Sequence, residues 1–163
     1  MTAFLDRVGA PYFFGDNGPN AFDCSSGVLD AMNRSGFKRA DATADMLYRD
    51  LAPVPEADAK AGDLAFYGPG GGTPGARATH VVMLLASRGR AIIGANGGDS
   101  FAQRGKTETG DAFIARRAEY VARMAKANAS VRLGDHRAKG ARYRVDLLGY
   151  GRLPWEASKL VVG

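Results

Sequence analysis

The hydrophobic period of the chain changes partway along its length. Residues 24–35 and 43–51 carry apolar side chains at helical spacing. Residues 63–67, 80–85 and 91–93 are instead short apolar runs separated by turn residues, a pattern typical of strands. Short connections favour antiparallel neighbours, so the sequence predicts an α+β fold with N-terminal helices packed on a central antiparallel β-sheet.

The second half of the chain predicts one additional, C-terminal helix and two more strands. The longest helical pattern covers residues 111–128, where apolar residues recur at helical spacing and basic residues occupy other faces. Strands are expected near 129–133 and 143–153, and segment 87–90 predicts a tight hairpin. Because the sequence shows neither a repeat nor a linker, residues 1–163 are expected to form a single domain.

Composition excludes several classes of protein. With 45% hydrophobic and 24% charged residues, the chain has the composition of a globular protein and not of a disordered tail. No apolar stretch reaches the roughly 18 residues that span a bilayer, so no membrane insertion is expected. The formal charge of +5 permits contact with nucleic acid, anionic lipid or an anionic wall polymer, but selects none of them.

Cysteine and histidine are scarce, and this limits the possible chemistry. One cysteine excludes an internal disulfide. With only two histidines beside it, a Cys/His zinc site is not expected, and neither a metal nor a cofactor is predicted. Residues 1–7 lack the basic start and apolar core of a secretory signal, so delivery outside the cytoplasm would need another route.

Cys24 lies at the predicted start of a helix, after the Gly- and Pro-rich turn at residues 15–20. The unpaired N–H groups and the positive end of the helix dipole favour the thiolate over the thiol at this place. An activated thiolate is what a cysteine nucleophile requires. The alternative is that Cys24 is a small buried core residue.

His80 opens an apolar strand directly after a Gly-rich loop, where its side chain can face a cleft beyond the sheet edge. A catalytic thiol needs an imidazole that takes its proton and later gives one to the leaving amine. His136 lies in a polar turn without apolar residues to fix its geometry, so His80 is the preferred base. The alternative is a strand-end histidine that bonds only to backbone.

Four motifs together resemble the NlpC/P60 family of papain-like cysteine peptidases. The likeness covers roughly residues 3–100, and the order, the spacing and the helix-to-strand change all agree with it. The motifs are Pro-Tyr-Phe-Phe-Gly at 11–15, Phe-Asp-Cys-Ser-Ser at 22–26, Gly-Asp-Leu-Ala-Phe at 62–66 and His-Val at 80–81.

The resemblance implies a papain-like α+β fold with Cys24 on the first core helix and His80 on the adjoining sheet. The family usually orients the imidazole with a third polar residue, commonly a histidine, but the aligned position holds Gly94. Asn96 points to the same side of an extended strand, and its amide oxygen could orient the imidazole. The alternatives are Asp99, a backbone carbonyl, or no third residue.

Three further residues match substrate-binding positions of the family. Tyr12 matches the cleft tyrosine, whose hydroxyl can donate toward a developing oxyanion or hold the substrate. Asp23 and Ser25 match positions that contact the free amine of the peptide stem in many members. The alternative role for Asp23 and Ser25 is to cap the helix. Asp63 is expected to be structural, bonding local backbone N–H groups.

The activity that the resemblance implies is hydrolysis of amide bonds in peptidoglycan stem peptides, most often between D-Glu and the diamino acid. Neither a metal nor an organic cofactor is needed for it. A non-catalytic component of a phage tail is an alternative, favoured by Gly94, and a Cys–His acyltransferase is another.

The C-terminal portion resembles phage-encoded members of the family more than secreted ones. Secreted members generally carry a signal peptide and wall-binding repeats, and the sequence shows neither, so no separate wall-binding domain is expected. The chain is therefore expected in a phage tail, or in the host cytoplasm before release. Phage tail proteins are then possible partners, and no nucleic acid is expected.

Overall fold

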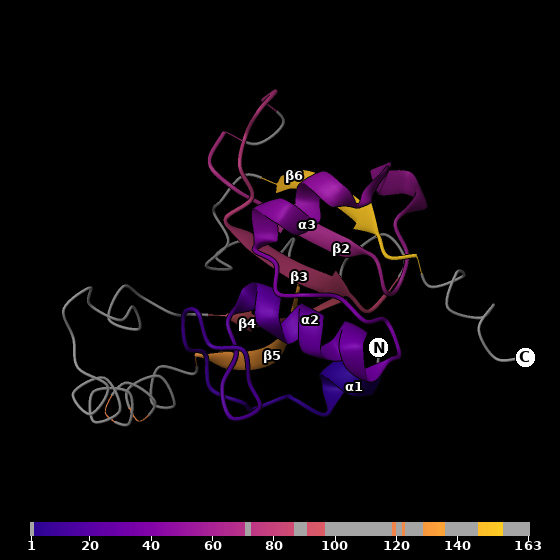
Figure 1. Cartoon of the computed structure of the whole chain (residues 1–163). Coiled ribbons are helices and arrows are strands. Elements are labelled where there is room, and N and C mark those ends of the chain that lie inside the picture. The colour runs from indigo at the N-terminus through magenta and orange to yellow at the C-terminus, as the bar shows by residue number, and fades with distance from the viewer. Residues whose placement is uncertain are drawn as a thin grey trace, which may run out of the picture.

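The computed structural model of the chain describes residues 2–70, 73–86, 91–96, 119, 122, 129–135 and 147–154. Within this part of the chain, short helices cover one face of a six-stranded sheet (Figure 1). None of these helices has the length and apolar character needed to cross a lipid bilayer. The predicted α+β arrangement of N-terminal helices on an antiparallel sheet is confirmed.

The central helix, α2 (Cys24–Arg34), begins at a capping box. The Asp23 side chain accepts a hydrogen bond from the Ser26 backbone N–H, and the Ser26 hydroxyl accepts one from the Asp23 N–H. The helix ends just before Gly36, whose φ of +88° is a left-handed conformation that glycine adopts without strain. The predicted helix over 24–35 is thus confirmed.

Two further α-helices flank α2, namely α1 (Thr2–Leu5) and α3 (Ala44–Asp50). The Thr43 hydroxyl caps α3 by accepting a hydrogen bond from the Met46 N–H. A short 3-10 helix, η1 (Glu56–Asp58), follows. The second predicted helix is therefore present, and α1 and η1 are additions that the hydrophobic pattern did not predict.

The sheet has the strand order β1-β6-β2-β3-β4-β5, and every adjacent pair is antiparallel. This order brings the C-terminal strand β6 between β1 and β2. The strands are β1 (Ala52–Val54), β2 (Leu64–Tyr67), β3 (His80–Leu84), β4 (Ala91–Asn96), β5 (Ser130–Asp135) and β6 (Leu147–Arg152).

Alternating side chains divide the core between the two faces of the sheet. Val81 and Met83 of β3 join the main cluster under the helices, together with Val28 of α2. Val82 and Leu84 join a second cluster on the opposite face. Helix α2 packs on β3 and β4, and α3 packs on β3, so the start of α2 is fixed beside the centre of the sheet.

Several predicted boundaries differ from the structure for identifiable reasons. Strand β4 runs to Asn96, beyond the predicted end at residue 93, because it pairs with β5 along its whole length. Pro53 ends the preceding helix as expected, but it also lies in β1, which pairs with β6 at the sheet edge where proline is tolerated. The predicted hairpin at 87–90 and helix at 111–128 lie outside the described residues, apart from Glu119 and Ala122 in the helix.

Candidate active site

Cys24 is the first residue of α2, and the capping box of Asp23 and Ser26 fixes its position. The residue is 8% exposed, so Cys24 is buried. The backbone N–H of Val81, next to His80 in the chain, hydrogen-bonds to this thiol. The nucleophile predicted from the helix and the base predicted from the strand are therefore neighbours in the fold.

His80 and Asn96 meet because of the pairing between β3 and β4. Met83 pairs with Ile93 and Leu84 with Ile92. Continuing this register toward the start of β3 brings His80 opposite Asn96. The His80 Nε2 and Asn96 Oδ1 atoms lie 2.9 Å apart, and Asn96 is only 3% exposed. Among the candidates for a third residue, the structure thus brings Asn96 to the imidazole.

The Asn96 side chain also determines which imidazole nitrogen carries the proton. Its Nδ2 group donates a hydrogen bond to the Gly94 carbonyl at 2.8 Å, so its oxygen must face His80. An amide oxygen accepts hydrogen bonds only, and His80 must therefore donate from Nε2. The Nδ1 atom is left unprotonated in the neutral ring, as a general base requires.

Gly94 is explained by close packing between β3 and β4. A Cβ atom at position 94 would lie 2.7 Å from Cγ1 of Val82, which is closer than real Cβ contacts come. A histidine at this position would therefore require Val82 to give way. The sheet instead presents the polar partner two residues further along the same face, at Asn96.

Burial dominates the electrostatics of Cys24. Burial, and to a smaller extent the neighbouring Asp23 carboxylate, raise the pKa of the thiol to about 12. The backbone N–H groups of Val81, Ser25 and Cys24 lower the pKa, but by less. The expectation that the helix start makes Cys24 a thiolate is therefore wrong for the free protein, because desolvation outweighs the N–H groups.

The imidazole of His80 is held neutral for the same reason. Burial lowers its pKa to about 4, while the hydrogen bond with Asn96 and the charge of Asp23 act in the opposite direction. At neutral pH the resting pair is therefore a neutral thiol beside a neutral imidazole. Such an imidazole is free to accept a proton.

Asp23 and Ser25 both take part in capping α2. The Asp23 Oδ1 atom accepts hydrogen bonds from the Ser26 N–H at 2.8 Å and the Ser25 hydroxyl at 3.1 Å. Its Oδ2 atom accepts one from the Gly15 N–H at 3.1 Å. The capping alternative of the sequence analysis is thus observed, and the carboxylate also ties the segment around Gly15 to the start of the helix.

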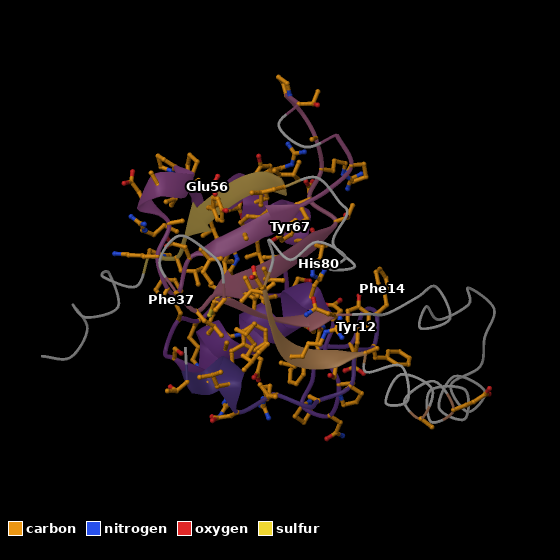
Figure 2. The ribbon with its side chains drawn as sticks, turned by 180° about the vertical axis from the view of Figure 1, so that it is seen from behind. Tyr12, Phe14, Phe37, Glu56, Tyr67 and His80 are labelled. Atoms are coloured by element: carbon orange, nitrogen blue, oxygen red, sulfur yellow. The ribbon has the colours of Figure 1, made fainter. Side chains whose placement is uncertain are left out.

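Tyr12 lies on an extended segment that runs beside the start of α2. Its backbone N–H donates to the Ala129 carbonyl at 3.1 Å, and it forms a parallel bridge with Phe22. The side chain is largely buried. Figure 2 shows Tyr12 and Phe14 on this segment, together with His80 and Tyr67 on the sheet.

No sequence motif points to Tyr67, yet it lies directly opposite His80 in the pairing of β2 with β3. The centres of the two rings are 6.2 Å apart, with 44° between their planes. The strand itself was predictable, but its register was not, because a long loop separates β2 from β3. A shorter, tighter hairpin would have fixed that register from the sequence.

The segment that leads into His80 is tied to α3. The Asp45 carboxylate accepts a hydrogen bond from the Ala78 N–H at 3.0 Å and pairs with Arg49 and Arg77. The hydrogen bond from Arg49 is the main reason why the pKa of Asp45 lies below its usual value. Among the described residues, no group of three or more acidic, histidine or cysteine side chains could hold a metal ion.

The chain is similar to known proteins both in sequence and in fold. The sequence is 36% identical over 70 residues to the murein DD-endopeptidase MepH of Escherichia coli; this match covers 41% of the chain and 26% of the relative. The fold resembles an NlpC/P60 family protein of Bacillus cereus, with a TM-score of 0.63 and 17% identity, over 93% of the chain and 39% of that protein.

A second solved structure matches the chain nearly end to end. The NlpC/p60 domain of the peptidoglycan hydrolase SagA has a TM-score of 0.60 and 19% identity, covering 93% of the chain and 94% of that domain. The model of the NlpC/P60 family matches residues 9–126, a span that includes Cys24, His80 and Asn96. The chain described here therefore belongs to the NlpC/P60 family.

Proposed function

We propose that the chain hydrolyses amide bonds in peptidoglycan stem peptides through an acyl-enzyme on Cys24. The observation that carries this proposal is the hydrogen bond between His80 Nε2 and Asn96 Oδ1, on a strand whose next residue, Val81, bonds to the Cys24 thiol through its backbone N–H. Relatives described as a murein DD-endopeptidase and a peptidoglycan hydrolase support the choice of substrate.

The neutral resting pair determines how the first step proceeds. His80 Nδ1 takes the thiol proton as Cys24 Sγ attacks the amide carbonyl, so a free thiolate need not accumulate. The tetrahedral oxyanion accepts hydrogen bonds from the Cys24 backbone N–H and the Tyr12 hydroxyl. The imidazolium then gives its proton to the leaving amine, and the C–N bond breaks to leave a thioester.

The second half of the reaction uses the same groups in reverse. His80 Nδ1 takes a proton from water as the water oxygen attacks the thioester carbonyl. The second tetrahedral intermediate collapses, the C–S bond breaks, and the proton on the imidazole returns to Cys24. Asn96 keeps Nε2 protonated throughout, and so holds Nδ1 toward the reacting atoms.

Asp23, Ser25 and Tyr12 are proposed to bind the substrate. The Asp23 carboxylate attracts the free amino group of a stem peptide, and Ser25 holds that carboxylate in place through its hydroxyl. The formal charge of +5 would keep the protein near an anionic wall polymer, an attraction that salt weakens.

The finer assignments stay predictions. These are cleavage between D-Glu and the diamino acid, a phage-encoded origin, association with tail proteins, and action in the virion or in the host cytoplasm before release. Gly94 favours a degenerate, non-catalytic site, because glycine has no side chain to orient the imidazole. The Asn96–His80 hydrogen bond speaks against such a site, because Asn96 supplies the missing partner.

The proposal is tested by digesting purified sacculi with wild type and with Cys24→Ala. We expect wild type to release stem-peptide fragments with new amino groups, identified by mass spectrometry, and the variant to release none. Release by both proteins would remove Cys24 from the mechanism. Inactivity of both would favour a structural protein, and transfer of the acyl group to an added amine without hydrolysis would favour an acyltransferase.

The role of Asn96 has its own test. Asn96→Ala should lower turnover by about tenfold or more while leaving the fold intact, because the imidazole loses the group that fixes its tautomer. Circular dichroism checks the fold, and the rate of fragment release gives turnover. A rate equal to wild type would remove Asn96 from the site.

A further inference from the structure

The His80 imidazole lies in a row of side chains that crosses the sheet. Asn96 of β4 lies on one side of it and Tyr67 of β2 on the other. Figure 2 shows Tyr67 and His80 close together on these adjacent strands. The hydrogen bond from Nε2 fixes one edge of the imidazole, whereas the ring of Tyr67 faces it from the neighbouring strand.

The proposed mechanism assigns no role to Tyr67. It is 2% exposed and belongs to a buried core cluster, so its side chain offers almost no surface to a peptide substrate. A ring in this position can act on the reaction only through His80. The contact of 6.2 Å with 44° between the planes is in the range of tilted aromatic pairs.

We propose that Tyr67 is a positioning residue that holds the His80 imidazole against Asn96 and excludes water from the face of the ring. This inference rests on the proposed function, because it assumes that His80 is the base. It goes beyond that function because it assigns a role to Tyr67, which contacts the imidazole from the side opposite Asn96 and is not one of Cys24, His80 and Asn96.

The proposal agrees with the charges around the imidazole. Among the described residues, the groups that act on His80 include the Asp23 carboxylate, the Asn96 amide and the Tyr67 ring. Asp23 and Asn96 both favour the charged imidazolium, so the neutral form depends on desolvation. Tyr67 contributes apolar surface on the β2 side, and its removal would admit water there.

The experiment follows the imidazole directly, by NMR titration of the histidine Cε1–H signals. The sequence has only two histidines, and His136→Ala identifies the signal of His80. Tyr67→Leu removes the ring but keeps much of its volume, and Tyr67→Phe keeps the ring. Tyr150→Leu is the matched control, because Tyr150 is buried in the same cluster but pairs with Ala65 near the other end of β2.

We expect Tyr67→Leu to raise the pKa of His80 by about one unit toward its ordinary value, since water reaches the ring. Turnover should fall by about tenfold with KM changed less than about twofold, because the residue does not touch substrate. Tyr67→Phe should retain the wild-type pKa and turnover. Tyr150→Leu should lower stability but leave both quantities unchanged.

A His80 pKa unchanged in Tyr67→Leu would overturn the proposal, as would an equal shift in Tyr150→Leu. The titration needs no substrate, so it remains decisive even if wild type fails to digest sacculi. If Tyr67→Leu shifts the pKa of His80 but wild type does not digest sacculi, the role of Tyr67 stands and the proposed reaction is rejected. If Tyr67→Leu does not fold, loss of the wild-type pKa in Tyr67→Phe would count against the proposal.

Discussion

Strand β2 has a titratable group at each end, one buried and one partly buried, and the two groups have different hydrogen-bond partners. Before its first residue, Asp63 is 1% exposed and accepts two hydrogen bonds from the Arg152 guanidinium, at 3.0 and 2.8 Å. Opposite its last residue, His80 is bonded to the neutral amide of Asn96. One end pairs a charge with a charge, and the other pairs a base with an uncharged group.

The difference follows from what each end must do. Both oxygens of the Asp63 carboxylate bond to the Arg152 guanidinium, and Arg152 thereby links β6 to the turn that precedes β2. A full negative charge beside His80 would favour the imidazolium and raise the pKa of the ring, whereas only the neutral imidazole can accept the thiol proton. The neutral amide orients the ring and leaves its proton affinity low enough for exchange.

The largest effect, on the free energy of unfolding, is expected from removing the Arg152–Asp63 ion pair. Arg152→Met leaves the Asp63 carboxylate buried without its cation, which should lower the free energy of unfolding by about 3 kcal/mol. Urea unfolding at pH 7 measures it. Arg152→Lys is the control, and should lose less because it keeps the charge. A loss under about 0.5 kcal/mol in Arg152→Met would show that the pair contributes little.

Asn96→Asp replaces the neutral partner of His80 with a charged one. A carboxylate at this position favours the imidazolium and should raise the pKa of His80 by about one to three units, which corresponds to about 1.4 to 4 kcal/mol of interaction. NMR titration measures the shift. Asn96→Ala, which removes the hydrogen bond without adding charge, is the control and should not raise the pKa. No shift in Asn96→Asp would contradict the electrostatic contrast between the two ends.

The pH dependence of stability should reflect the neutral pair. His80 has a pKa of about 4 against an ordinary 6.5, so the unfolded chain binds more protons between these values and stability falls as pH falls through them. The pKa of Cys24 is about 12 against an ordinary 9.0, so stability falls as pH rises above 9.

Urea unfolding measured across the pH range tests both the acid loss of stability from His80 and the alkaline loss from Cys24. Between pH 9 and 10, wild type should lose about 1 kcal/mol more than Cys24→Ala, which lacks the titrating thiol. Parallel curves for the two proteins over this interval would mean that the Cys24 thiol ionises as readily in the folded state as in the unfolded one.

The smallest effect is expected at the segment before His80. Asp45→Ala removes the acceptor for the Ala78 N–H and should cost about 1 kcal/mol of stability, with a few-fold loss of turnover. Asp45→Asn, which keeps an acceptor oxygen, should retain most of the turnover. If both variants keep wild-type turnover, the link from α3 does not help to place His80.

Local sequence patterns were sufficient to predict the fold class and to propose the nucleophile and the base. The change from helical spacing to short apolar runs separates the two layers, and Cys24 and His80 stand at element starts that caps and turns define. Each of these signals is contained in a few consecutive residues, so it can be recognised without knowledge of the whole chain. The C-terminal helix predicted at 111–128 lies outside the described residues except at two positions, and stays a prediction.

Strand pairing and burial, by contrast, were decided only in the folded molecule. The sequence left four possibilities for the partner of His80, and the register of β3 against β4 brings Asn96 to within hydrogen-bond distance of the imidazole, whereas Asp99 lies outside the described residues. It predicted a thiolate at Cys24, but desolvation by distant segments keeps the thiol protonated. Register and dielectric environment depend on residues far apart along the chain, so no local motif contains them.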